Sequence, residues 1–156
     1  MHEAHSVWSA GRSVCLCSDH LDRAGRLNNL GNHFLCRYER SGNLQDLEAA
    51  IARSQAAVEA TPEDHPDRAG RLSNLGAHVS SQYERSGNLQ DLEAVIAAYL
   101  ASWEILSAPV LHCIRAALKA AEILVFRPSV RDVSRACYLL RNAITLMPLL
   151  TLRSLD

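Results

Sequence analysis

The alternation of apolar and polar residues predicts α-helices along most of the chain. The clearest apolar stripe has spacings of three, four and four residues and consists of Leu27, Leu30, Phe34 and Tyr38. Residues three or four positions apart lie on the same face of an α-helix, so this stripe predicts an amphipathic helix. A second stripe follows and consists of Leu47, Ala50, Ile51, Ser54, Ala57 and Val58. It predicts a second helix, which Pro62 should end.

This pair of predicted helices belongs to an internal repeat. Residues 19–49 recur at 64–94, and 24 of the 31 aligned positions are identical. Self-similarity with a period of about 20 to 50 residues is typical of stacked units, each of which buries its apolar face against its neighbours. The chain is therefore expected to form a helical array rather than a single compact bundle.

Local signals set the expected ends of the helices. An Asp-x-x-Asp sequence resembles a capping box at a helix start. A glycine after Arg-Ser can close a helix in the left-handed conformation, and the asparagine after it can cap the next helix. In the two copies these positions are Asp19 and Asp64 for the first start, Gly42 and Gly87 for its end, and Asn43 and Asn88 for the cap.

A third, more divergent unit follows the two copies. An apolar stripe between Pro109 and Pro128 predicts its first helix and consists of Leu111, Ile114, Leu118, Ala121 and Val125. The expected organisation is a degenerate or truncated helix over 1–18, units at about 19–63, 64–108 and 109–148, and a tail at 149–156. Within the units, six helices should form three antiparallel pairs. Leu149, Leu150, Leu152 and Leu155 in the tail predict an exposed apolar end that self-associates or docks to a further domain.

Composition narrows the functional classes. The chain has 156 residues, 48% of them hydrophobic, which suits one globular domain. Its formal net charge of -1 disfavours nucleic acid as a partner, and no apolar run approaches the length of a membrane span. Five cysteines are an odd number, and no Asn-x-Ser/Thr glycosylation site occurs. These features favour a reducing, intracellular location, which we take to be the cytoplasm.

The repeat resembles the tetratricopeptide repeat. The residues that carry this resemblance are Leu27, Leu30, Gly31 and Phe34 in the first helix, Ala50, Ser54, Ala57 and Pro62 in the second, and Ala136, Leu140, Ala143 and Pro148 in the third unit. The unit is longer than the standard one and is more similar to the kinesin light chain variant. The resemblance implies an all-α, right-handed superhelix of antiparallel helix pairs, which is a tetratricopeptide-like α-solenoid.

Two phrases, HPDRAGRLSNLG and YERSGNLQDLEAAI, resemble repeat arrays of fungal-type proteins that carry a caspase-like CHAT peptidase domain. The tail sequence AITLMPLLTLRSL is similar to the junction before that domain. This resemblance implies an alternative function, in which the chain is the regulatory or sensing repeat part of a CHAT peptidase whose catalytic domain is missing from this chain.

Chemistry within the chain itself has little support. The potential zinc ligands His2, His5, Cys15, Cys17 and His20 have no standard spacing, and His20 recurs as His65 in a unit without cysteines. Cys36 lies three residues from His33, but it is replaced by Ser81 in the second copy and has no orienting acid. Phosphate-binding glycine motifs do not occur. We therefore expect no metal, no cofactor and no enzymatic activity.

A polar stripe beside the apolar one is the candidate binding site. Its residues are Arg26, Asn29 and His33 in the first unit, Arg71, Asn74 and His78 in the second, and Arg115 and Lys119 in the third. In tetratricopeptide arrays the first helices line a concave groove, and an asparagine before Leu-Gly holds a peptide backbone. The resemblance thus implies a protein or peptide partner, whose acidic side chains the arginines would favour.

Two other interpretations of this stripe remain open. A recent duplication copies a solvated face as faithfully as a selected one. In addition, Asp22 and Asp67 lie four residues before Arg26 and Arg71, so the arginines can form intrahelical ion pairs instead of binding a ligand.

Overall fold

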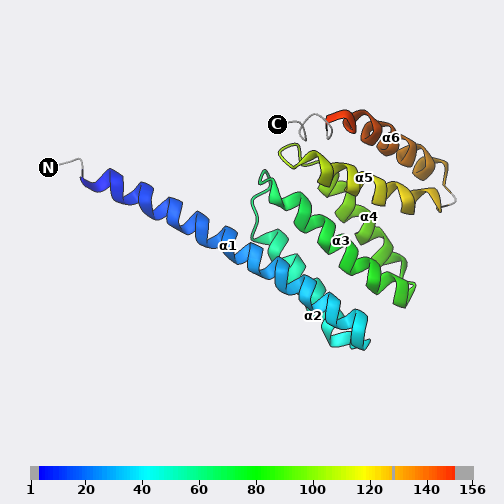
Figure 1. The fold of residues 1–156 in the computed structure, drawn as a ribbon, viewed down its shortest axis with the longest axis horizontal. Helices are drawn as coiled ribbons and strands as arrows, with labels where there is room; N and C mark the ends of the chain where they lie inside the picture. The colour runs from blue at the N-terminus through cyan, green and yellow to red at the C-terminus, as the bar shows by residue number, and fades with distance from the viewer. Residues whose placement is uncertain (1–3, 128, 150–156) are drawn as a thin grey trace.

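The computed structural model describes residues 4–127 and 129–149, with side chains from His20 onward. This part of the chain is all-helical and contains no strand, which confirms the all-α prediction (Figure 1). The helices are α1 (Ala4–Ser41), α2 (Leu44–Glu59), α3 (Asp67–Ser86), α4 (Leu89–Trp103), α5 (Val110–Val125) and α6 (Val130–Leu146). None of these helices combines the length and the apolar character needed to cross a bilayer.

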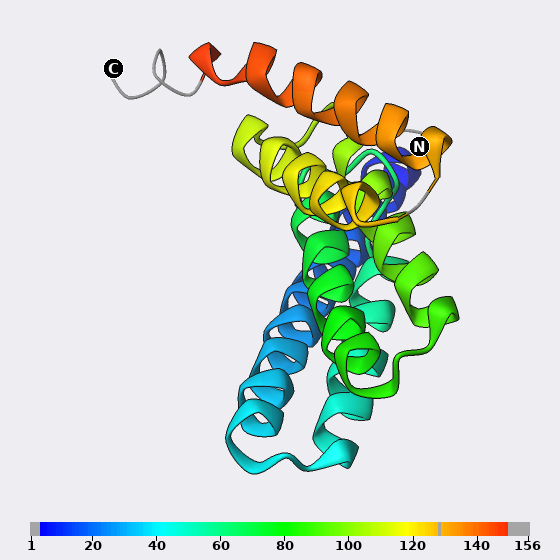
Figure 2. The same cartoon turned by 90° about the vertical axis from the view of Figure 1, so that its right-hand side faces the viewer.

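The helices pack as three consecutive pairs, α1 with α2, α3 with α4 and α5 with α6 (Figure 1). Each pair is joined to the next because α2 packs on α3 and α4 packs on α5. The backbones of α1 and α3, and of α3 and α5, also approach each other, whereas those of the second helices of the described pairs do not. The stack therefore bends toward α1, α3 and α5, which form its concave side. Figure 2 shows α6 at one end of the stack.

The predicted ends of the first helices and caps of the second helices are confirmed in both copies. Gly42 and Gly87 have φ angles of 67° and 65°, in the left-handed region that suits glycine. Their amides donate to the carbonyls of Tyr38 and Tyr83 at 2.7 and 2.8 Å and close the helices. The side chains of Asn43 and Asn88 then accept the amides of Gln45 and Gln90 at 3.0 and 2.9 Å. These local hydrogen bonds fix the sharp turn within each of the first two pairs.

The predicted helix starts are wrong. Helix α1 begins at Ala4 and continues through Asp19, so residues 4–18 belong to the first helix instead of a separate degenerate one. Proline is absent between these positions, so nothing in the backbone stops the helix from extending. In the second copy α3 begins at Asp67, three residues later than expected, because Pro66 precedes it and His65 lies in a turn.

The predicted apolar stripe of α5 is only partly buried. Ile114 and Ala121 lie in the core as expected, but Leu111, Leu118 and Val125 are exposed. The buried face is instead completed by small side chains and one leucine, namely Cys113, Ala116, Ala117, Ala120 and Leu124. Helix α5 packs against both α4 and α6, and alanines allow this close approach where leucines would not. The burial therefore follows side-chain size rather than hydrophobicity alone.

The outer face of α6 remains uncovered. Val133 and Ile144 are exposed on it, as is Met147 just after the helix. They align with Leu47 and Val58 of α2 and with Thr61 after it, which are buried. Ile144 is 63% exposed, whereas Val58 is 8% exposed beneath α3. Of the four tail leucines in the expected apolar end, Leu149 is exposed and the other three lie outside the described residues. Self-association through this end stays a prediction.

Candidate binding groove on the concave face

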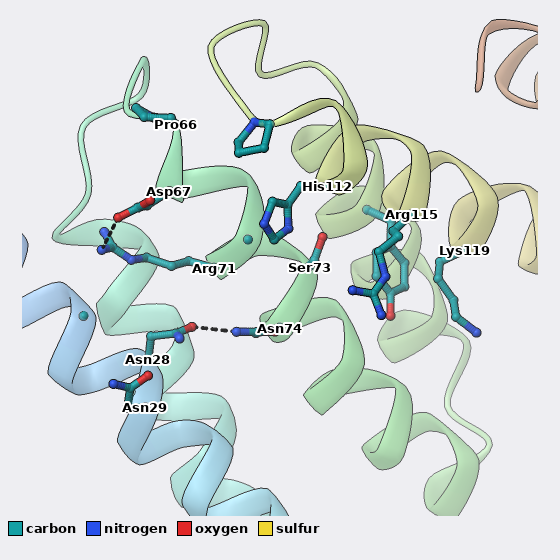
Figure 3. A pocket seen from close by; sticks show the side chains of 14 residues that line it. Asn28, Asn29, Pro66, Asp67, Arg71, Ser73, Asn74, His112, Arg115 and Lys119 are labelled. Carbon is teal, nitrogen blue, oxygen red and sulfur yellow. Dashed lines mark hydrogen bonds and ion pairs between the residues drawn. The ribbon is translucent and has the colours of Figure 1, made fainter. Parts of the chain in front are cut away.

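A cleft of about 550 Å³ crosses the concave side between α1, α3 and α5 (Figure 3). It contains five of the eight predicted site residues, which are Asn29, Arg71, Asn74, Arg115 and Lys119. Asn28, Ser73 and His112 also line it and were not predicted as site residues. Arg26, His33 and His78 do not line the cleft. The repeat register thus brings together polar residues that are up to 90 positions apart in the chain.

An asparagine pair connects the first two helices of the groove. The Asn74 side-chain amide donates to Asn28 Oδ1 at 2.9 Å, so this group holds α3 to α1 (Figure 3). The side-chain carbonyl oxygen of Asn74 can still accept a hydrogen bond. Asn29 lies beside the pair, is exposed and forms no hydrogen bond within the described part of the chain. Asn29 therefore offers both a donor and an acceptor to a ligand.

Arg71 is committed to the fold rather than to a ligand. It is 7% exposed and donates to the Thr61 hydroxyl and, at 3.3 Å, to the Asp67 carboxylate. The predicted Asp67–Arg71 pair is thus confirmed. The equivalent Asp22 and Arg26 do not pair with each other, and Arg26 is exposed. Arg71 thus lines the cleft while it is bound within the fold, Arg26 lies outside the cleft, and contact of either arginine with a ligand stays a prediction.

The cationic side of the groove is formed by α5. Arg115 is exposed, lines the cleft and forms no ion pair within the described residues. Lys119 pairs with Glu122 at 3.0 Å, but both side chains are about 60% exposed. Such surface pairs contribute about 0 to 1 kcal/mol, so Lys119 can exchange this partner at little cost. An anionic group in the cleft would therefore meet Arg115 first.

A second cleft of about 540 Å³ continues the groove between α3 and α5. Tyr99 and Lys119 line both clefts, so they join the two. The second cleft has apolar lining from Leu92, Ile123 and Phe126. Burial, with a smaller effect of the Glu122 and Glu84 carboxylates, raises the pKa of Tyr99, so its hydroxyl stays neutral at physiological pH. The second cleft thus combines apolar side chains with the charged groups of Glu84, Lys119, Glu122 and Arg127.

His78 is a buried connector of helices, so the prediction that it faces a ligand is wrong. Its ring is 1% exposed, with Nδ1 2.7 Å from Ser54 Oγ and Nε2 3.1 Å from Asn32 Oδ1. An amide oxygen can only accept, so Nε2 donates to Asn32 and Nδ1 accepts from the Ser54 hydroxyl. His78 therefore joins α3 to both helices of the first pair. The equivalent His33 is exposed because no helix pair precedes α1 in the described structure.

The two junctions between helix pairs are filled in different ways. At the first, His78 from α3 fills the space above the small Ser54 of α2. At the second, Tyr99 of α4 occupies the position of Ser54, and Lys119, which aligns with His78, lies exposed. A glycine leaves room for the α2 or α4 side chain at each junction. A β-carbon at Gly31 would lie 2.7 Å from Ser54 Oγ, and one at Gly76 would lie 3.1 Å from the Tyr99 ring. The large side chain that fills the junction thus comes from α3, the first helix of the following pair, at the first junction and from α4, the second helix of the preceding pair, at the second.

We expect acid to destabilise the protein through His78. Burial lowers the pKa of this ring, although the nearby Ala50 backbone opposes the effect. The folded pKa thus lies below the unfolded value of about 6.5. Stability from His78 is complete above the unfolded pKa and is lost as the pH falls through the folded one. Urea unfolding at pH 7.5 and 5.0 should show a smaller acid loss for His78→Gln than for wild type. His33→Gln is the control and should keep the wild-type loss, and equal losses for all three proteins would contradict this role.

The described side chains contain no group of three or more residues that could hold a metal ion. His2, His5, Cys15 and Cys17 of the hypothetical zinc site lie outside these side chains. Cys36 and His33 are both exposed and form no hydrogen bond with each other. The groove is thus the main feature with the properties of a binding site.

Comparisons with protein-family models, curated proteins and solved structures give no match. The functional interpretation therefore rests on the repeat and the groove.

Proposed function

We propose that the chain is a noncatalytic interaction module that binds an extended peptide segment of a partner protein in its concave groove. In this proposal the helix pairs form a tetratricopeptide-like, right-handed superhelix. The paired packing and the layer of α1, α3 and α5 support it, because first helices line the groove in such arrays. Exposed thiols at Cys36 and Cys137 support a reducing location such as the cytoplasm.

One observation carries this proposal, namely the cleft that crosses all three first helices and presents two polar groups, on α1 and α5, that have no partner in the described structure. An extended peptide has no internal hydrogen bonds and presents a donor and an acceptor at each residue. The Asn29 amide matches both requirements. Arg115 adds a charge without a partner in the described structure, and it can bind a carboxylate in a bidentate manner. The groove therefore suits a peptide with acidic side chains.

The second candidate function is the regulatory or sensing repeat part of a CHAT peptidase. The uncovered apolar face of α6 favours it, because a neighbouring domain would bury this surface. The reading frame downstream of Asp156 tests this candidate. A caspase-like His and Cys pair encoded there would support it, and a stop codon would contradict it.

A peptide-array screen followed by titration of the best hits tests the proposed function. We expect Asn29→Ala combined with Arg115→Gln to weaken binding at least about tenfold, because a hydrogen bond to a charged group contributes about 1.5 to 3 kcal/mol. Both residues are exposed, so the variant should keep the wild-type helix content. Arg26→Gln is the matched control and should bind normally, since Arg26 lies outside the cleft. Equal affinity of the double variant and wild type would contradict the proposed groove.

Asn74, which is the equivalent of Asn29 in the second unit, is less suitable for this test. Asn74 bonds to Asn28, so its removal would loosen the contact between α1 and α3 as well as any ligand contact. A lower affinity of Asn74→Ala would thus have two explanations.

A further inference from the structure

The exposed edge of α1 repeats the interface by which α3 docks onto α2. Three residues of α3 bind α2 or its end, a leucine lies between them in the sequence, and the same four residue types recur on α1 at an offset of 45 residues. The pairs are Arg68 with Arg23, Arg71 with Arg26, Leu75 with Leu30, and His78 with His33. All four are buried or half-buried on α3, and all four are exposed on α1. The α1 edge thus carries the residue types of a contact whose geometry is seen on α3, and nothing in the described part of the chain covers it.

The α3 edge recognises the carboxyl end of a helix. Arg68 donates to the carbonyl of Val58 at 2.7 Å and to the carbonyl of Thr61. These carbonyls belong to the last turn and the exit of α2, where backbone acceptors have no partner within the helix. The exit is shaped by a hydrogen bond from the Thr61 amide to the Val58 carbonyl at 3.1 Å. Arg68 therefore binds backbone groups, which any helix with the same exit would present.

Helix α6 ends at Leu146, one residue later than α2 in this alignment, and no arginine binds its last carbonyls within the described structure. The Met147 amide donates to the Ile144 carbonyl at 3.2 Å, and these residues align with Thr61 and Val58. The exposed apolar face of α6 aligns with the face of α2 that α3 covers. The two ends of the stack therefore carry the arginine and the last-turn carbonyls of one contact, which is complete between α2 and α3. The rest of α6 offers an apolar surface, because Leu140 and Met147 align with Ser54 and Thr61, the α2-side partners of His78 and Arg71.

We propose that copies of this chain stack head to tail, with α6 of one copy docked on the α1 edge of the next. Arg23 would bind the last-turn carbonyls of the neighbouring α6, as Arg68 binds those of α2 within the chain. Leu30 and the aliphatic parts of Arg23 and Arg26 would cover Ile144 and Met147 of the neighbour. The contact joins two different surfaces, so it leaves one free surface of each kind and builds open chains of copies.

Sedimentation velocity over a range of concentrations tests this proposal. Wild type should form larger species as its concentration rises through tens of micromolar. Ile144→Glu on α6 and Arg23→Glu on α1 should each weaken association at least about tenfold, because each removes one half of the contact. Leu106→Glu is the control, since Leu106 is 99% exposed on the connection between α4 and α5. It should associate like wild type, and circular dichroism checks that all variants keep their helix content.

Mixing the two variants distinguishes head-to-tail stacking from a two-fold contact. Ile144→Glu retains an intact α1 edge, and Arg23→Glu retains an intact α6 face. An equimolar mixture should therefore form a dimer but no longer chains. If Ile144→Glu abolishes association while Arg23→Glu has no effect, α6 pairs with α6 of a second copy and the proposal is wrong. A wild type that stays monomeric at 100 micromolar would equally overturn it, as would a mixture that stays monomeric.

Discussion

Replacing Leu124 by alanine is expected to lower the free energy of unfolding by about 2 to 5 kcal/mol, as is typical for a fully buried leucine. Leu124 is 1% exposed and lies in the core between α4, α5 and α6. Truncation removes apolar contacts and leaves a cavity that the surrounding helices can fill only in part. Urea or thermal unfolding followed by circular dichroism measures the loss.

Leu118→Ala is the matched control on the same helix. Leu118 is 41% exposed, so its truncation should cost less than about 1 kcal/mol. The comparison also separates two descriptions of α5, because the apolar stripe in the sequence includes Leu118, whereas the observed core includes Leu124. A larger loss for Leu118→Ala than for Leu124→Ala would mean that α5 is rotated about its axis relative to the structure described.

Alanine at Gly31 and alanine at Gly25 are expected to change stability in opposite directions. A β-carbon at Gly31 would lie 2.7 Å from Ser54 Oγ and 3.2 Å from the Ala50 carbonyl oxygen, so α1 and α2 would have to separate. Such overpacking typically costs about 1 to 3 kcal/mol. At Gly25 a β-carbon would contact nothing within 4 Å. Alanine there should stabilise the helix by about 0.5 to 1 kcal/mol, since glycine is the weaker helix former.

Denaturant unfolding of the two glycine variants beside wild type measures both effects. Because both substitutions are the same and lie on α1, their difference reports the packing against α2 and not the helix propensity. A stabilising Gly31→Ala would show that α1 and α2 lie farther apart than described.

The sequence was sufficient for features that depend on neighbouring residues. The left-handed glycines and the asparagine caps were predictable because each forms its hydrogen bonds within a few positions. Repetition at an offset of 45 residues then predicted the successive helix pairs. By contrast, burial of the identical residues His33 and His78 differs because only His78 has a helix pair on its other side. No local pattern contains that information.

The candidate groove was predictable only in part, for a related reason. Asn29 and Arg115 were placed correctly because a polar stripe at helical spacing stays on one side of its helix. Asn28 and Asn32 were missed, although they bond Asn74 and His78 across the junction. Both occupy positions where the two copies differ, with Ser73 and Ala77 in the second unit. Each of these bonds thus joins a position that differs between the copies, Asn28 or Asn32, to one that is identical in both, Asn74 or His78.

The unlike fillings of the two junctions also mean that the units cannot be exchanged. If residues 64–108 were deleted, as unequal crossing-over between tandem copies can do, α2 would meet α5 directly. Ser54 would then face Lys119 in place of His78, which would leave the serine without its partner and the space above it unfilled. A shortened array of this kind would pay the cost of a buried void and an unsatisfied hydroxyl. Each junction therefore fits only the two units that form it, so an array that lost its middle unit would be less stable than the complete one.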